Sequence, residues 1–169
     1  MSTPNQDYVF FWRPPSQDPQ PQACLSQWAG SPFEVAGKRY LTAEHWMMAE
    51  KARLFEDAEI EGKVLVAAHP KSVKALGRKV RGFDDATWCE AREQIVLEGS
   101  LHKFRQNPDL LEFLLSTGEA TLVEASPYDR IWGIGLRAEQ PAALDPTRWR
   151  GLNLLGLALM QARAQLRAE

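Results

Sequence analysis

Residues 42–55 limit the possible folds of the chain more than any other stretch, because they have the pattern of a helix with charged groups on an apolar face. Glu44 and Lys51 stand seven residues apart, so at 100° per residue their side chains point within roughly 20° of each other. The apolar residues near the same stripe are Met47, Met48 and Phe55. We predict a helix, capped by Thr42, that places a carboxylate and an amine where burial can shift their pKa values. A solvated or salt-bridged pair is the alternative, because Glu and Lys are common on helix surfaces.

The whole chain has the properties of an ordinary globular protein. The length of 169 residues predicts a single domain over residues 1–169, with a core over about 8–166. The net charge of −2 indicates no global basic field for nucleic acid. Cys24 and Cys89 lack metal-ligand spacing. No segment approaches the roughly 20 apolar residues of a membrane span, and no secretion signal is present. We therefore expect a reduced, cytoplasmic protein without a membrane span, a metal or a cofactor.

Hydrophobic periodicity predicts a mainly α fold (α+β) with a small antiparallel β element. The segments with strand character are residues 8–12, 38–41 and 121–125. We expect the first two in one small antiparallel sheet. Helices are predicted over residues 42–55, 59–68, 69–80, 85–106, 108–117 and 152–166.

A basic run lies between Glu61 and Asp84, where the sequence contains no acid. Its members are Lys63, Lys71, Lys74, Arg78, Lys79 and Arg81. A solvated helix face explains such a run. A ligand that carries phosphate is the functional alternative, because Arg offers a fork and Lys a point charge to phosphate oxygens.

Three further side chains of this half of the chain are candidates for binding. Trp88 and Arg92 are one helical turn apart, which suits either packing with a surface charge or a stacking platform beside an anion contact. His45 follows Glu44 directly. A histidine is more often a surface or satisfied core residue than a ligand.

A loop in the second half, residues 126–135, contains Asp129, Trp132 and Gly133. A carboxylate, an indole and glycines with backbone freedom suit the binding of a polar ring or a ribose, and equally a plain turn. Asn153 either caps the last helix or donates a hydrogen bond to a ligand.

Many short fragments stand in a definite order along the chain: Leu25-Ser26, Phe33, Gly37 to Tyr40, Thr42-x-Glu44-His45, Lys51-Ala52, Pro70, Leu76-Gly77-Arg78, Trp88, Arg92, Lys103-Phe104-x-Gln106-Asn107-Pro108, Thr117-Gly118, Glu124, Ser126-Pro127-x-Asp129, Trp132-Gly133-x-Gly135, Trp149-x-Gly151-x-Asn153, Leu155-Gly156 and Leu159-Met160. In this order and spacing they resemble the NADAR family, also called YbiA-like. The resemblance covers residues 8–163. The chain departs from the family at Met48, where the family has Gln, and at Gln27 and Trp28, where it has Asn-Phe. These departures bear on substrate choice more than on reaction type.

The resemblance implies a helical domain with a small β element and an enzyme that cleaves N-glycosidic bonds to ribose. Its expected substrates are phosphoribosylamino-pyrimidine intermediates of riboflavin biosynthesis. One alternative is the removal of ADP-ribose from guanine in nucleic acid, against which the net charge of −2 argues. A second is a non-catalytic module that binds ADP-ribose or NAD. The partner is thus a phosphoribosyl or ADP-ribosyl small molecule, with nucleic acid only as a modified substrate, and the oligomeric state is left open.

The resemblance also assigns residues to the site. By motif position, Glu44, Trp88 and Asp129 match the family's active-site residues, and Lys51 matches a lysine proposed to attack the anomeric carbon. We expect Glu44, Lys51 and Asp129 to be catalytic, because breaking a bond at an anomeric carbon needs carboxylates or an amine nucleophile. The expected substrate-binding residues are His45, Arg78, Trp88, Arg92, Trp132, Gly133 and Asn153.

Overall fold

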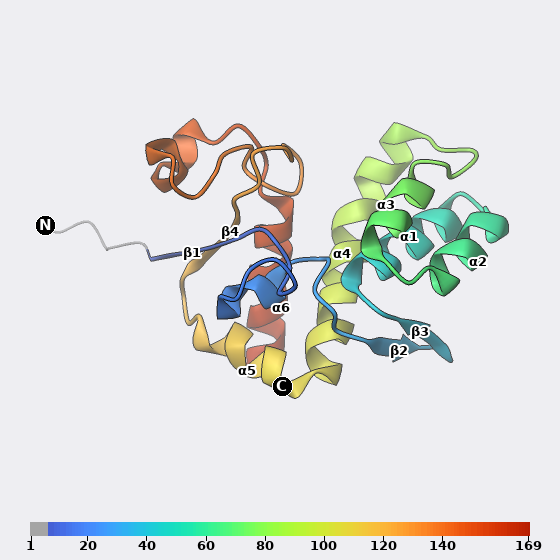
Figure 1. The fold of residues 1–169 in the computed structure, drawn as a ribbon, viewed down its shortest axis with the longest axis horizontal. Helices are drawn as coiled ribbons and strands as arrows, with labels where there is room; N and C mark the ends of the chain where they lie inside the picture. Colours follow the sequence, from blue (N-terminus) through green and yellow to red (C-terminus); the bar gives the residue numbers. More distant parts are fainter. Residues whose placement is uncertain (1–6) are drawn as a thin grey trace, which may run out of the picture. The chain divides into compact units, whose positions relative to one another are not determined.

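The computed structural model describes residues 7–169, which form two compact units (Figure 1). The central unit is Gln27–Pro108, and the terminal unit combines the chain up to Ser26 with Asp109–Glu169. The central unit contains β2 (Phe33–Val35), β3 (Lys38–Tyr40), α1 (Ala43–Leu54), α2 (Ala58–Val66), α3 (Pro70–Gly77) and α4 (Asp85–Gln106). The terminal unit contains β1 (Tyr8–Phe11), α5 (Pro108–Ser116), β4 (Thr121–Glu124), α6 (Leu154–Arg167) and the 3₁₀ helices η1 (Pro21–Leu25), η2 (Pro141–Leu144) and η3 (Pro146–Arg148). The mainly α prediction is confirmed, and the single domain over residues 1–169 stays a prediction.

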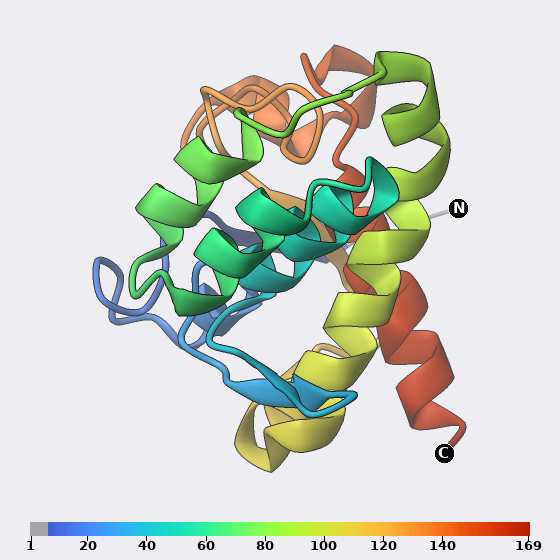
Figure 2. The same cartoon turned by 90° about the vertical axis from the view of Figure 1, so that its right-hand side faces the viewer.

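Helix α1 is the centre of its unit, because it packs against α2, α3 and α4 (Figure 2). Its N-terminus is capped as predicted, since the Thr42 Oγ1 atom accepts a hydrogen bond of 3.2 Å from the His45 backbone N–H. Toward α4, the indole N–H of Trp46 donates to the carbonyl of Ile95 at 2.9 Å. Gly99 makes this close approach possible, because an added Cβ would lie only 2.4 Å from the Trp46 ring.

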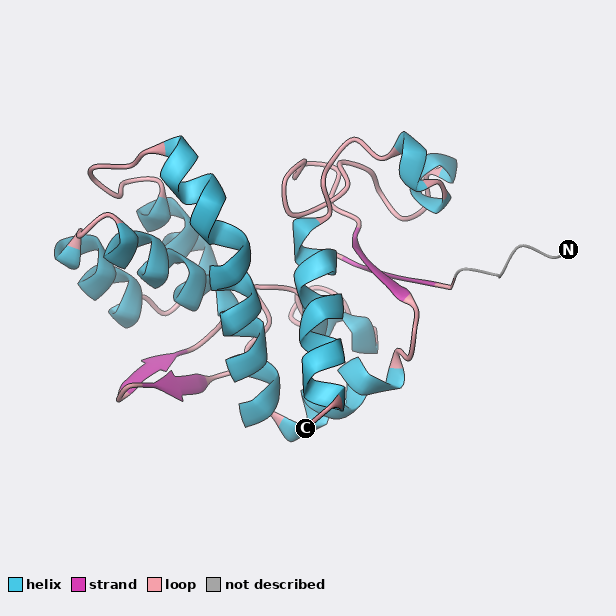
Figure 3. Cartoon of the chain, turned by 180° about the vertical axis from the view of Figure 1, so that it is seen from behind, coloured by secondary structure: helices cyan, strands magenta, loops and turns pink. Residues whose placement is uncertain are grey.

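A two-residue turn joins β2 to β3 in an antiparallel hairpin (Figure 3). Ala36 and Gly37 both have positive φ, 52° and 77°, which is the backbone that a tight hairpin of right-handed twist requires. The hairpin places Phe33 and Tyr40 opposite each other, with ring centroids 5.5 Å apart. Both rings also contact Trp46 of α1. The hairpin therefore anchors the start of α1 through an aromatic cluster.

The terminal unit contains the other sheet, in which β1 and β4 pair in parallel from Tyr8 opposite Thr121 to Phe11 opposite Glu124. Helix α6 packs against β4. The core beside this sheet is made of Val123, Ala125, Ile134, Leu136 and Ala143. The prediction that residues 8–12 pair with residues 38–41 is wrong, because these strands belong to different sheets.

Candidate active site

Glu44 lies in the first turn of α1 and is buried, with 4% of its surface exposed. Its backbone N–H donates to the carbonyl of Gln27 at 3.0 Å, which ties the segment before the hairpin to the start of this helix. The carboxylate thus belongs to the interior of the central unit. The alternative of a solvated surface pair is excluded for Glu44.

Lys51, two turns along α1, is held by groups from other segments of the central unit. Its Nζ atom donates to the carbonyl of Gly77, at the C-terminal end of α3, over 2.8 Å. The same atom lies 4.7 Å from the ring centroid of Phe83 and 5.5 Å from that of Trp88. The amine is therefore enclosed by one carbonyl and two aromatic rings.

The surroundings of Lys51 lower its pKa from the ordinary value of 10.5. Burial is the main cause, because removal of water disfavours the ammonium form. The Glu44 carboxylate raises the pKa and the Arg78 guanidinium lowers it. Glu44 and Lys51 therefore interact electrostatically, as their shared helix face predicts, and the net result favours a neutral amine more than in water.

The departure at Met48 lies against Gly77, the residue whose carbonyl binds this amine. Met48 is buried and packs on Gly77, where an added Cβ would lie 1.9 Å from the Met48 sulfur. Gly77 therefore lets α3 approach α1 until its last carbonyl reaches Lys51. The methionine makes this contact apolar.

His45 is buried, and both of its ring nitrogens already have partners. Nε2 lies 2.8 Å from the carbonyl of Ala67, which can only accept, so this nitrogen carries the proton. Nδ1 lies 2.7 Å from the Thr42 hydroxyl. Burial is the main cause that lowers the pKa of the imidazole below 6.5. These contacts link the start of α1 to the end of α2, and a role of His45 in substrate binding stays a prediction.

The two predicted arginines differ in their surroundings. Arg78 follows α3 and is exposed. Arg92 lies on α4, one turn after the buried Trp88, and its Nε atom is buried without an acceptor among the described residues. A buried guanidinium nitrogen without a partner is unfavourable. An anionic ligand is the kind of group that would satisfy it.

The basic run is divided by its ion pairs. Arg81 donates to Asp57 through Nε at 3.1 Å and through Nη2 at 2.8 Å, and Lys63 pairs with Glu59 at 2.9 Å. Both cations thus form ion pairs with acids of α2 or its N-cap. Among the residues that the structure describes, Lys71, Lys74, Arg78 and Lys79 have no carboxylate within ion-pair distance.

In the terminal unit, Asp129 organises the loop after β4. Its Oδ1 atom accepts from the backbone N–H groups of Ile131 and Trp132 at 2.9 and 2.8 Å. Its Oδ2 atom accepts no hydrogen bond from any described residue. Gly133 lies against this turn, where an added Cβ would meet the Asp129 carbonyl at 3.0 Å. The geometry fits a turn, and the catalytic role of Asp129 and the binding roles of Trp132 and Gly133 stay predictions.

Asn153 occupies the N-cap position of α6, in a left-handed conformation with φ of 53°. Its side chain does not cap the helix. The amide Nδ2 donates to the carbonyl of Leu122 at 3.0 Å, and Oδ1 accepts from the Glu124 N–H at 3.0 Å. Asn153 therefore joins α6 to the backbone of β4, and its predicted contact with a ligand stays a prediction.

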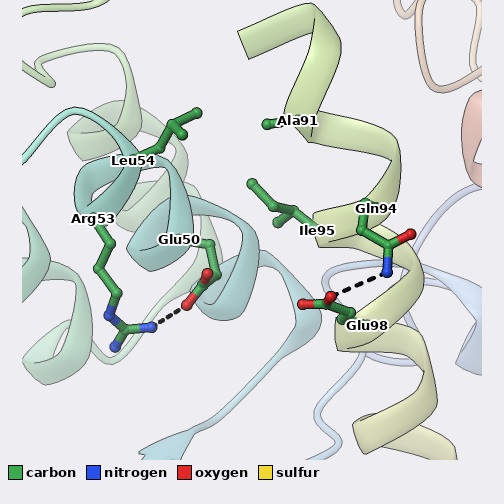
Figure 4. Close-up of a pocket in the computed structure, with 7 residues that line it drawn as sticks. All are labelled: Glu50, Arg53, Leu54, Ala91, Gln94, Ile95 and Glu98. Carbon is green, nitrogen blue, oxygen red and sulfur yellow. Dashed lines mark hydrogen bonds and ion pairs between the residues drawn. The ribbon is translucent and has the colours of Figure 1, made fainter. Parts of the chain in front are cut away.

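A groove of about 430 Å³ lies between other side chains of α1 and α4 (Figure 4). It is lined by Glu50, Arg53, Leu54, Ala91, Gln94, Ile95 and Glu98. Its polar groups are paired, since Arg53 bonds to Glu50 and Gln94 donates to Glu98. Neither Glu44 nor Lys51 lines it, so we do not assign the reaction to this groove.

The sequence did not predict two contacts of the Lys51 amine, with the Phe83 ring and with the carbonyl of Gly77. Phe83 follows a glycine in a loop, which carries no periodic signal, and a backbone carbonyl carries no signal at all.

Over residues 7–169, no cluster of His, Cys, Asp or Glu is placed to hold a metal ion. None of the helices in this range is long and apolar enough to cross a membrane.

Comparison with known proteins identifies the family. Residues 10–167 match the NADAR domain. The chain is 47% identical over 126 residues to an N-glycosidase of Acanthamoeba polyphaga mimivirus, covering 75% of this chain and 74% of that protein. It is 31% identical over 145 residues to the N-glycosidase YbiA of Escherichia coli (strain K12), covering 86% and 82%.

The fold agrees with this match. The NMR structure of the E. coli protein YbiA superposes with a TM-score of 0.76 and 28% identity, over 96% of this chain and 86% of that one. The resemblance seen in the sequence is confirmed. The chain therefore belongs to the NADAR family and is an N-glycosidase.

Proposed function

We propose that this N-glycosidase hydrolyses the C–N bond between ribose phosphate and the base of phosphoribosylamino-pyrimidine intermediates of riboflavin biosynthesis, with Lys51 as an amine nucleophile. The observation that carries the proposal is the enclosure of Lys51, whose pKa is lowered mainly by burial, on the same helix as a buried Glu44. A surface lysine is protonated at neutral pH and cannot attack carbon. Because its pKa is lowered, Lys51 has a larger neutral fraction than a surface lysine at the same pH.

The proposed reaction begins with one proton held by the pair, on Glu44, and with Lys51 neutral. The amine attacks C1 of the ribose, and the C–N bond to the base breaks. The base nitrogen keeps the electron pair of that bond and takes the proton from Glu44. The Glu44 carboxylate then removes a proton from the new ammonium.

The sugar is released by water. The ring oxygen takes the proton back from Glu44 as the ring opens, which leaves a protonated Schiff base between C1 and Nζ. Glu44 removes a proton from water, whose oxygen adds to C1. Glu44 gives this proton to Nζ, the C–N bond to Lys51 breaks, and Glu44 takes the hydroxyl proton as C1 becomes the aldehyde, so Lys51 ends neutral and Glu44 ends protonated. One water is consumed for each base released, and Glu44 serves as acid and base in turn.

Arg92 and Arg78 are the proposed partners of the phosphate. Arg92 is supported by its buried Nε atom, which has no acceptor among the described residues. Arg78 is supported by its electrostatic effect on Lys51, which shows that its charge is felt at the amine. Arginine is suited to this task because its fork matches two phosphate oxygens.

A second candidate substrate is ADP-ribosylated guanine in nucleic acid. It is favoured by Lys71, Lys74 and Lys79, since these cations on or next to α3 have no carboxylate within ion-pair distance in the described part of the chain. A substrate with several phosphates gains more from such a group than one with a single phosphate. The non-catalytic module is dropped, because the chain is an enzyme.

The substrate is tested by incubating the purified protein with a phosphoribosylamino-uracil and, in parallel, with ADP-ribosylated guanine DNA. We expect release of ribose phosphate from the first. Glu44→Gln is expected to reduce kcat at least about 100-fold, because a proton-transfer group contributes 10²–10⁴-fold, and Lys51→Met is expected to abolish turnover.

Lys63→Met is the matched control, because Lys63 is exposed and paired with Glu59 on α2. It should turn over at the wild-type rate. Release of ADP-ribose alone would replace the first substrate with the second. An unchanged rate in Lys51→Met would remove the amine from the reaction.

A further inference from the structure

Phe83 is presented to the site by the loop between α3 and α4. The residue before it, Gly82, has φ of 73°, a left-handed backbone that favours glycine. The Phe83 ring packs on Phe55 at the end of α1, with centroids 5.4 Å apart and planes tilted by 59°. The ring is therefore fixed at the C-terminal end of the helix that carries Lys51.

Phe83 and Trp88 contact the same amine but differ in exposure. Phe83 is 45% exposed, whereas Trp88 is 8% exposed. The Phe83 ring, whose centroid lies 4.7 Å from Nζ, is thus the more exposed of the two rings at this amine. A large apolar side chain left half exposed gives up part of the stabilisation of burial, and its contact with the Lys51 amine gives Phe83 a role that can be tested.

We infer that Phe83 is a positioning residue, which shields the Lys51 amine from water and, together with the Gly77 carbonyl, holds it on the face that it shares with Glu44. This inference rests on the proposed role of Lys51 as nucleophile. Phe83 itself touches no reacting atom in this account. It acts through the amine, by keeping it dehydrated and restricting its rotation.

Burial by the Phe83 ring and electrostatic attraction to its face change the Lys51 pKa in opposite directions. The larger of the two decides whether loss of the ring raises or lowers that pKa. A ring face attracts an ammonium, which favours the charged form. Burial, to which the same ring contributes, is the largest influence on the Lys51 pKa and favours the neutral form. Loss of the ring therefore raises the pKa of Lys51 toward its ordinary value.

The charges that act on Lys51 come from two elements. Glu44 lies on its own helix and Arg78 follows α3. Of the other described elements packed against α1, α4 contributes the Trp88 ring, and neither α4 nor α2 contributes a charge that shifts the Lys51 pKa. A Phe83 variant thus leaves every charge around the amine in place and changes its hydration and its contact with the ring face.

The test is a titration of the Lys51 side chain by NMR in protein labelled with ¹³C-lysine, with the resonance assigned from its loss in Lys51→Met. We expect Phe83→Ser to raise the midpoint toward 10.5, and Phe83→Tyr, which keeps the ring, to leave it at the wild-type value. Phe83→Leu should lie between the two. Val66→Ala, at an apolar residue that is 83% exposed, is the control for loss of exposed apolar surface and should not move the midpoint.

A second readout is kcat against pH. The plateau of kcat should fall in Phe83→Ser, because a higher Lys51 pKa moves the one proton of the pair from Glu44 to the amine, and it should return to the wild-type level in Phe83→Tyr. An unchanged Lys51 midpoint in a folded Phe83→Ser, or a rise in KM alone, would overturn the inference. The titration needs no substrate, so its failure is distinct from failure of the proposed reaction, which would appear as no release of sugar by the wild-type protein.

Discussion

Lys51 is a residue at which opposing effects act on one pKa. Its hydrogen bond to Gly77 favours the ammonium form, whereas the rings of Phe83 and Trp88 attract the charge with their faces and also exclude water from it. The end of α3 also favours the ammonium form, because a helix C-terminus carries partial negative charge. Burial opposes these attractions, and the pKa is lowered. The amine is thus both held in place and available in its neutral form.

Arg78 offers a direct test of this balance. Its positive charge lowers the pKa of Lys51, so Arg78→Gln should raise that pKa. Since the reactive form holds the one proton of the pair on Glu44 and leaves Lys51 neutral, a higher Lys51 pKa moves that proton to the amine, and kcat should fall over the whole pH plateau without recovery in alkaline buffer. KM is expected to increase as well, because Arg78 is a proposed phosphate partner.

The control is Lys79→Gln, which removes a neighbouring exposed cation that is not among the charges acting on Lys51. Its pH profile of kcat should match the wild type. A kcat plateau that stays at the wild-type level in Arg78→Gln would show that the two charges are not coupled.

At the level of elements, α1 is positioned by bonds at both ends. His45 links its first turn to Ala67, which follows α2, and Lys51 links its last turns to α3. The N-cap at Thr42 and the helix itself were predictable, because caps and periodicity are local signals. The partner of Lys51 on α3 was not, because it is a backbone carbonyl supplied by tertiary packing.

The link through His45 predicts a pH dependence of stability. The folded-state pKa of His45 lies below the ordinary 6.5, so the unfolded chain binds more protons and stability falls as the pH falls below about 6.5 toward the folded-state pKa. In His45→Gln this part of the fall is absent, and the loss of Tm between about pH 7 and 5 should be smaller than in the wild type.

His102 has a lowered pKa as well, so a His45→Gln, His102→Gln double variant should have a smaller pH dependence than either single variant. Thermal unfolding followed by circular dichroism gives the measurement. The same loss of Tm with pH in His45→Gln and wild type would contradict the structural role of this histidine.

For the whole molecule, the helical fold and the family could be predicted from the sequence, but the pairing of strands could not. Strand character at residues 8–12 and 121–125 was visible locally, yet β1 pairs with β4 far along the chain. Parallel pairing of distant segments leaves no local trace, unlike the β2–β3 turn.

The same reason limits prediction of the site. Glu44 and Lys51 were predicted together because one helix carries both. Phe83 was missed because only the folded loop brings it to the amine. For Asn153, the sequence indicated a cap or a ligand donor, whereas its side chain bonds the backbone of β4.

Covalent attack by Lys51 is tested by reducing the turnover mixture with borohydride, followed by mass spectrometry of the digested protein. We predict a ribose phosphate adduct on the peptide that contains Lys51, and no adduct in Lys51→Met. Turnover by the wild-type protein without any adduct would contradict it and would leave a water activated by Glu44 as the nucleophile.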